Sequence, residues 1–100
     1  MPATFEFNKY GPRKLSVLTD QYKFGGGLVV ELIDETGEPY TRVSTNCEVQ
    51  LAHDEFVFKT YSENDGLLEA MVAAGIVETT GRFVEVGMAG PQPICRLLKR

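Results

Sequence analysis

Cys47 and His53 are the most plausible thiol–imidazole pair in the sequence for nucleophilic catalysis. A cysteine nucleophile needs a base within hydrogen-bond reach, and usually a third group that orients the base. Asp54 follows His53 directly, but neighbouring residues along a strand face opposite ways. The pattern therefore favours a small buried thiol and a surface histidine over a thiol enzyme.

Cysteine and histidine are also too scarce for a structural zinc site, which needs four thiolate or imidazole ligands. The second cysteine, Cys95, lies far along the chain from Cys47, and there is no Cys-x-x-Cys pair. We expect two unpaired thiols, as in a reducing compartment, and neither a metal nor a cofactor.

The run Ser62-Glu63-Asn64-Asp65-Gly66 resembles a fragment of a calcium-binding loop. Such loops place their ligands at alternating positions and end on a glutamate, whereas the polar residues here are consecutive. Ser62 is a good helix N-cap, and acids in a first turn favour the positive end of a helix. We interpret the run as a helix start.

Three consecutive glycines, Gly25 to Gly27, suggest a phosphate-binding loop. Such a loop leads directly into a helix, and the phosphate-binding type also carries a Gly-Lys-Ser/Thr sequence. Here the β-branched run of Leu28-Val29-Val30 follows instead. The pattern favours a flexible hairpin connection.

The residues after Ser62 predict one helix, at about residues 63–74. Its apolar stripe is formed by Leu67, Leu68, Met71 and Val72. Gly75 fits the left-handed position that ends a helix, and Ile76 the apolar residue that folds back on the last turn. We expect Ser62 to cap this helix, and Leu68 and Met71 to lie in the core.

The remaining elements read as strands, because apolar residues alternate or form short β-branched runs. About six or seven strands are expected, near residues 3–10, 14–22, 28–35, 40–46, 55–61, 76–87 and 93–98. Short turns join most of them. This favours a single α+β domain over residues 1–100, mainly an antiparallel sheet with the helix packed on one face. The order of the strands stays open.

Composition places the chain among ordinary globular domains, with 43% hydrophobic and 24% charged residues. No apolar run approaches the roughly 20 residues that cross a bilayer. The first residues show no basic segment followed by an apolar stretch, so no signal peptide is expected. These features predict a cytoplasmic protein without a membrane partner.

The net charge of −4 conceals an uneven distribution. Residues 31–85 carry twelve acids and three bases, and the remaining residues carry seven bases and two acids. If the first and last strands lay side by side, a basic patch would form from Lys9, Arg13, Lys14, Arg96 and Arg100. Such a patch would suit nucleic acid, although the overall sign of the charge opposes it.

Aromatic residues beside turns are candidates for binding a protein rather than nucleic acid. The candidates are Tyr10, Tyr22, Phe24 and Tyr40, whose side chains can project beside a turn. Aromatic anchors of this kind carry much of the affinity in protein–protein interfaces. They are the predicted protein-binding residues.

Three segments together resemble a family of small proteins of unknown function from phages, plasmids and other mobile elements. They are GGLVVELIDETGEPYTRVSTN, EFVFKTYSENDGLLEAMVAAGIVETTGR and GMAGPQPICRLL. The pieces at residues 61–64 and 80–82 are the most specific, whereas the run from Gly87 to Pro91 departs from the family pattern. The resemblance implies a mobile-element setting, and it carries no known activity and no catalytic residues.

The leading hypothesis from sequence is a non-enzymatic phage or mobile-element protein that binds a host or phage macromolecule. Inhibition of a defence system such as CRISPR is one such role, and it rests on the genetic setting alone. The alternative is a nucleic-acid-binding accessory protein that uses the basic N- and C-terminal segments. A small hydrolase or thiol enzyme is the third and weakest hypothesis.

Overall fold

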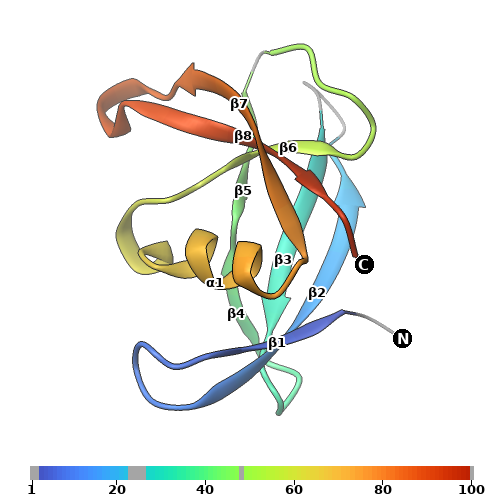
Figure 1. Cartoon of the computed structure of the whole chain (residues 1–100), viewed down its shortest axis with the longest axis vertical. Helices are drawn as coiled ribbons and strands as arrows, with labels where there is room; N and C mark the ends of the chain where they lie inside the picture. Colours follow the sequence, from blue (N-terminus) through green and yellow to red (C-terminus); the bar gives the residue numbers. More distant parts are fainter. Residues whose placement is uncertain (1–2, 23–26, 48, 100) are drawn as a thin grey trace.

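Two antiparallel sheets and one short α-helix make up the protein, as the computed structural model shows for residues 3–22, 27–47 and 49–99 (Figure 1). The first sheet has the order β1-β2-β3-β4. Its strands are β1 (Thr4–Phe7), β2 (Arg13–Gln21), β3 (Leu28–Ile33) and β4 (Pro39–Arg42). Each strand pairs with the next along the chain, so the sheet is a simple meander.

The second sheet has the order β5-β6-β8-β7, so its last strand lies between two earlier ones. Its strands are β5 (Ser44–Thr45), β6 (Glu55–Phe58), β7 (Val77–Glu85) and β8 (Pro91–Leu97). Between β6 and β7 come the 3₁₀ turn η1 (Ser62–Asn64) and the helix α1 (Leu67–Ala73). A second 3₁₀ turn, η2 (Gly87–Ala89), forms the tip of the β7–β8 hairpin.

Val43 joins the two sheets. It is the one residue between β4 and β5, and it is fully buried. Its N–H donates to the carbonyl of Val30 at 3.0 Å, and its carbonyl accepts from the N–H of Lys59 at 2.7 Å. The chain therefore passes directly from the first sheet into the second, and β1 and β7 are left as the two outer edges.

The helix α1 closes the gap between these edges. It contacts β1 on one side and β7 on the other. Figure 1 shows it lying between the blue β1 hairpin below and the orange β7 above. Leu67 and Met71 are fully buried and Leu68 is half-buried against the core. The prediction was confirmed for Met71, whereas Leu67 takes the central position expected of Leu68.

The end of α1 follows the sequence prediction. Gly75 adopts a left-handed φ of 72°. Its N–H donates to the carbonyl of Val72 at 3.0 Å, and the N–H of Ile76 donates to the carbonyl of Met71 at 3.0 Å. These are the two hydrogen bonds of a Schellman motif, and Ile76 is buried beneath the last turn as such a motif requires.

The predicted start of the helix was wrong. Ser62 lies in η1 with a left-handed φ of 62°, and α1 begins only at Leu67, with Gly66 at the N-cap and no side-chain capping bond. The physical reason is Asn64, which is fully buried. Its amide donates to the carbonyls of Arg42 at 3.0 Å and Lys59 at 2.9 Å, and its oxygen accepts from the Thr41 hydroxyl at 2.6 Å. These bonds tie the segment to β4 and β6, which a continuous helix would not allow.

The core lies between the two sheets and under α1. Its largest fully buried side chains include Leu15, Leu32, Phe56 and Phe58. The outer face of the second sheet is also buried in part, at Val57 and Ile94. The loop before β6 packs against the residue that precedes β3. Gly27 shows how closely this loop packs, because a Cβ there would lie 2.6 Å from Leu51 Cδ1 and 2.7 Å from the carbonyl oxygen of Glu55.

The predicted fold class, α+β with mainly antiparallel strands and one α-helix, was confirmed. Over the described residues the strands number eight in two sheets rather than about six in one. β2 and β3 pair as the hairpin expected around the glycine run, of which only Gly27 lies within the described residues. Cys47 and Cys95 are both free.

Candidate functional site

A pocket of about 370 Å³ lies between the start of α1 and the β7–β8 hairpin. Its lining residues are Thr60, Asn64, Asp65, Gly66, Leu68, Glu69, Phe83, Pro91 and Pro93. One wall is therefore the far half of the hairpin, and the opposite wall is the first turn of α1. We call this pocket the hairpin groove.

The apolar wall of the hairpin groove is an uncovered continuation of the core. Pro93 and Cys95 are two positions apart on β8, so they share the face that points into the core at Cys95. Phe83 is directly opposite Pro93 and lies on the same face. Cys95 is completely buried, whereas Phe83 is 64% exposed, because the hairpin extends past the start of α1 (Figure 1).

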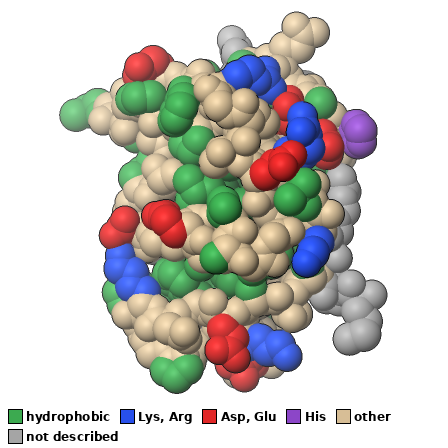
Figure 2. Space-filling view, in the orientation of Figure 1, with side chains coloured by type: hydrophobic (Ala, Val, Ile, Leu, Met, Phe, Trp, Pro, Cys, Tyr) green, Lys and Arg blue, Asp and Glu red, His purple; other side chains and the backbone are tan. Residues whose placement is uncertain are grey.

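The tip of the hairpin is also apolar. Met88 in η2 is fully exposed. Figure 2 shows hydrophobic side chains at the upper left of this face, and acidic side chains both near the top and lower down at the level of α1. A large exposed phenylalanine in a pocket and an exposed methionine on the same hairpin are features of a contact surface for another macromolecule.

The polar side chains of Thr60 and Asn64 in the pocket lining are already hydrogen-bonded. Gln92 is buried, and its oxygen accepts from both the N–H and the hydroxyl of Thr60, at 2.9 and 2.6 Å. Asn64 makes the three bonds described above. In the described part of the chain no buried side-chain polar atom lacks a partner. The back of the pocket is thus a rigid support, and no group there awaits a reaction partner.

The charge lining the pocket is negative. Asp65 and Glu69 line it, and no lysine or arginine does. Asp65 forms an ion pair with Lys9 from the β1–β2 turn, and this hydrogen bond raises the pKa of Lys9. Glu69 is exposed and has no ion-pair partner among the described residues. One carboxylate is therefore available to an incoming cation.

The aromatic residues predicted as anchors that lie in the described part of the chain have different surroundings. Tyr10 is 62% exposed and belongs to the turn whose Lys9 reaches Asp65, so it lies near the acidic side of the groove. Tyr40 packs edge-on against Phe7 at 6.5 Å between ring centroids. The hydroxyl of Tyr22 hydrogen-bonds to Ser44 Oγ at 3.1 Å. Phe24 lies outside the described residues.

The predicted basic patch depended on the first and last strands lying side by side, and they do not. β1 pairs with β2, and β8 pairs with β6 and β7 in the other sheet. Arg13 lies 3.7 Å from Asp34 and stacks over the Tyr40 ring at 5.0 Å. Lys14 is directly opposite Glu6 on β1. Arg100 lies outside the described residues.

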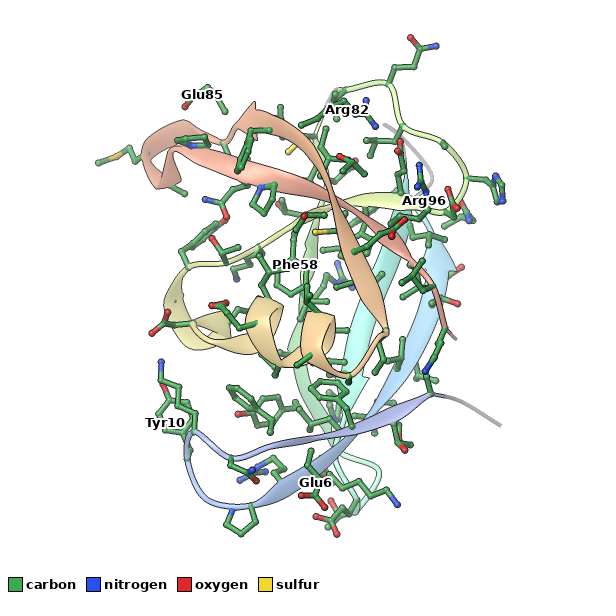
Figure 3. The ribbon with its side chains drawn as sticks, in the orientation of Figure 1. Glu6, Tyr10, Phe58, Arg82, Glu85 and Arg96 are labelled. Atoms are coloured by element: carbon green, nitrogen blue, oxygen red, sulfur yellow. The ribbon has the colours of Figure 1, made fainter. Side chains whose placement is uncertain are left out.

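Arg96 belongs to a charge network on the outer face of the second sheet. Its guanidinium lies 2.9 Å from Glu78, 3.5 Å from Asp54 and 3.6 Å from the buried Glu55. Arg82 also binds Glu55, at 2.7 Å. The N–H of Ala52 and the Arg82 guanidinium, each hydrogen-bonded to that carboxylate, lower the pKa of Glu55. Figure 3 shows Arg82 and Arg96 on this side, with Phe58 in the interior.

Sequence reasoning missed Phe83, Met88 and Glu69. Met88 carried a usable signal, because a large apolar side chain inside the turn Gly87-Met88-Ala89-Gly90 has no core to enter. Phe83 carried none, because its position in an alternating strand is typical of a buried residue. Only the length of the hairpin beyond α1 reveals its exposure.

A second, smaller pocket of about 260 Å³ lies at the other side of η1. It is lined by Tyr22, Arg42, Ser44, Thr45, Asn46, Lys59 and Tyr61. Its arginine is paired with Glu31 at 3.1 Å, and Tyr22 is bonded to Ser44. The pairing of its side chains makes it a weaker candidate than the hairpin groove.

No arrangement of catalytic or metal-binding groups stands out among the described residues. They contain no cluster of three or more His, Cys, Asp or Glu side chains suited to a metal ion. Burial raises the pKa of both thiols, that of Cys95 to about 12, so neither is a ready thiolate. Within the described part, no helix has the length and apolar character of a membrane span.

Comparison of the chain with protein-family models, with curated proteins and with solved structures found no match.

Proposed function

We propose that this protein binds another protein, without catalysing a reaction, and that the hairpin groove receives a segment of the partner. The observation that carries the proposal is Phe83. It lies on the core-facing side of the β7–β8 hairpin and yet is 64% exposed. Burying such a ring is worth about 1.5–3 kcal/mol, so a partner that covers it gains substantial free energy.

The acidic lining supports a protein partner over nucleic acid. Asp65 and Glu69 face the groove and would repel phosphates, from which nucleic-acid affinity largely comes. An apolar wall beside carboxylates instead suits a segment with an apolar side chain next to lysine or arginine. We infer a partner segment of that chemistry.

The resemblance to a mobile-element family supplies a setting for this activity. In that setting the partner is a host or phage protein, and a component of a defence system is one candidate. This part of the proposal rests on the resemblance, and the hairpin groove supports only the binding of a protein.

The test compares two charge substitutions at exposed apolar positions. Phe83→Asp removes the apolar wall of the groove, and Leu18→Asp places the same charge on β2, where the leucine is 47% exposed. Both variants and the wild type are immobilised, incubated with lysate of a bacterial host, and the captured proteins are quantified by mass spectrometry. We expect Phe83→Asp to lose the specifically captured protein and Leu18→Asp to retain it. Equal capture by all three, with Phe83→Asp folded, would contradict the proposal.

A further inference from the structure

β7 is an edge strand with one side open. Within the described part of the chain, β8 pairs with one side of it, and no strand pairs with the other. Most of β7 is exposed between Glu78 and Glu85. Its far half forms a wall of the hairpin groove through Phe83. The question is which backbone groups this open side presents.

The alternation of hydrogen-bonded pairs between β7 and β8 shows which backbone groups of β7 face its open side. The N–H of Val86 donates to the carbonyl of Gly90 at 3.0 Å. Bonded and non-bonded pairs alternate along an antiparallel ladder. Val84 and Gln92 are therefore a bonded pair, and Phe83–Pro93 and Glu85–Pro91 are non-bonded pairs. In non-bonded pairs the N–H and C=O groups point away from the partner strand.

Phe83 and Glu85 therefore offer their N–H and C=O groups on the open side of β7. Outside the strand ladders, neither N–H donates to a backbone carbonyl in the described part of the chain. The other side of β8 differs, because it pairs with β6. Pro91 and Pro93, the partners of Glu85 and Phe83, have no N–H to offer on that side. The open edge of this hairpin is therefore that of β7.

The side chains along the open edge define what it would accept. Phe83 and Glu85 are two positions apart and share the face that lines the groove. Residues directly opposite one another on adjacent strands contact each other on the same face. An added strand would therefore place one side chain against Phe83 and another, two positions along, against Glu85. Glu85 is exposed and has no ion-pair partner among the described residues.

We propose that the open edge of β7 binds an extended segment of the partner as an added strand, through the backbone of Phe83 and Glu85. The segment carries an apolar residue and a lysine or arginine two positions apart. Strand addition of this kind obtains affinity from main-chain hydrogen bonds and specificity from alternate side chains. The inference rests on the proposed function, and it specifies the form and chemistry of the partner.

A displayed library of random peptides, selected on the immobilised full-length protein, provides the probe. We expect the selected peptides to share an apolar residue and a lysine or arginine with one residue between them. The backbone nitrogens of one selected peptide are then methylated one at a time, and the affinity of each methylated peptide shows whether that N–H pairs with β7. Affinity should fall about tenfold at alternate positions and stay unchanged at those between, because only every second N–H faces β7. Loss at no position, or at every position, would overturn strand addition.

Amide hydrogen exchange measured by NMR gives the complementary result on the protein. On peptide binding, the amides of Phe83 and Glu85 should become protected, while that of Val84, already bonded to β8, should change little. Two variants at Glu85 distinguish the contribution of its backbone N–H to binding from that of its side-chain charge. Glu85→Pro removes the outward N–H and should weaken binding about tenfold, and Glu85→Gln keeps the N–H and should lose mainly the preference for a basic residue.

The outcomes distinguish this inference from the proposed function. Peptides that need Phe83 but leave the amides of Phe83 and Glu85 unprotected would overturn strand addition and leave the groove as the binding site. Peptides unaffected by both Phe83→Asp and Glu85→Pro would count against both proposals. A selection that yields no binding peptide would overturn strand addition. The proposal that the hairpin groove binds a protein would then be tested by the lysate capture experiment alone.

Discussion

Single side chains hold together parts of this fold that the backbone leaves unconnected. Asn64 is the clearest case, because one amide joins η1 to the ends of β4 and β6 by three hydrogen bonds. It lies at the back of the hairpin groove, directly before Asp65. Its bonds also fix the point at which the chain turns into α1.

We therefore expect Asn64→Ala to lower the free energy of unfolding by about 2–4 kcal/mol, because two carbonyls and the Thr41 hydroxyl lose hydrogen bonds to this buried side chain. Asn8→Ala, at an exposed asparagine, should change it by less than about 0.5 kcal/mol. Urea unfolding followed by circular dichroism measures both. If Asn64→Ala were as stable as Asn8→Ala, these hydrogen bonds would not hold η1 in place.

Cys95 gives a prediction at alkaline pH. Burial raises its pKa from 9.0 to about 12 in the folded protein. Between these values the unfolded chain loses the thiol proton and the folded chain keeps it. Stability should therefore fall as pH rises from 9 to 12, by at most about 1.4 kcal/mol per pH unit from this group. Below pH 9 this contribution is fully present.

The measurement is the free energy of urea unfolding at several pH values for wild type, Cys95→Ala and Cys47→Ala. The Cys95 variant should show a shallower decline above pH 9, whatever stability it loses from the missing sulfur. The half-buried Cys47 should matter less. Parallel curves for wild type and Cys95→Ala would show that the thiol ionises equally in both states.

At the scale of elements, local signals predicted the structure well wherever local forces decide it. The end of α1 was foreseen from Gly75 and Ile76, because a Schellman motif needs only neighbouring residues. The alternating strands were foreseen for the same reason. The start of the helix was not, because Asn64 finds its partners on β4 and β6, far away in sequence. The groove was missed because it depends on how far one hairpin extends beyond one helix.

Two glycines in turns show the difference between a position that needs a left-handed backbone and one that also has no room for a side chain. Gly27 and Gly37 have nearly the same left-handed φ, 90° and 88°. A Cβ at Gly27 would collide with Leu51 and the Glu55 backbone, whereas nothing lies within 4 Å at Gly37. Gly37→Ala should cost about 1–2 kcal/mol, the price of a left-handed alanine. Gly27→Ala should cost clearly more, because a backbone carbonyl cannot move aside.

Urea unfolding of the two alanine variants tests this comparison. Their difference reports the contact between the loop before β6 and the start of β3. Equal losses would mean that the loop moves away from Gly27 without cost.

For the whole molecule, the distribution of charge opposes nucleic-acid binding. The net charge is −4. Lys9, Arg13 and Arg96 each lie against an acid, and they belong to different sheets. We expect no binding to random DNA or RNA tighter than about 10 μM at physiological salt, weaker than typical specific binders.

Fluorescence anisotropy with labelled DNA and RNA across a salt series measures this. Any residual binding should be weak and steeply salt-dependent, since counterion release drives it. Binding to the selected peptides should weaken much less with salt, because burial of Phe83 is not screened. Tight binding of random DNA would favour the nucleic-acid-binding alternative.

The position of β8 between β6 and β7 also determines when the second sheet can fold during synthesis on the ribosome. β6, α1 and β7 emerge first, but until β8 has been made β6 can pair only with the two-residue β5, and β7 has no partner strand. Until then Phe56, Phe58 and Val77 lack part of their cover. In the nascent chain these side chains therefore stay accessible to chaperones and proteases until β8 has been synthesised. Folding of the second sheet is thus a late event of synthesis, and a chain cut short before β8 would be a substrate for quality control rather than a partly active protein.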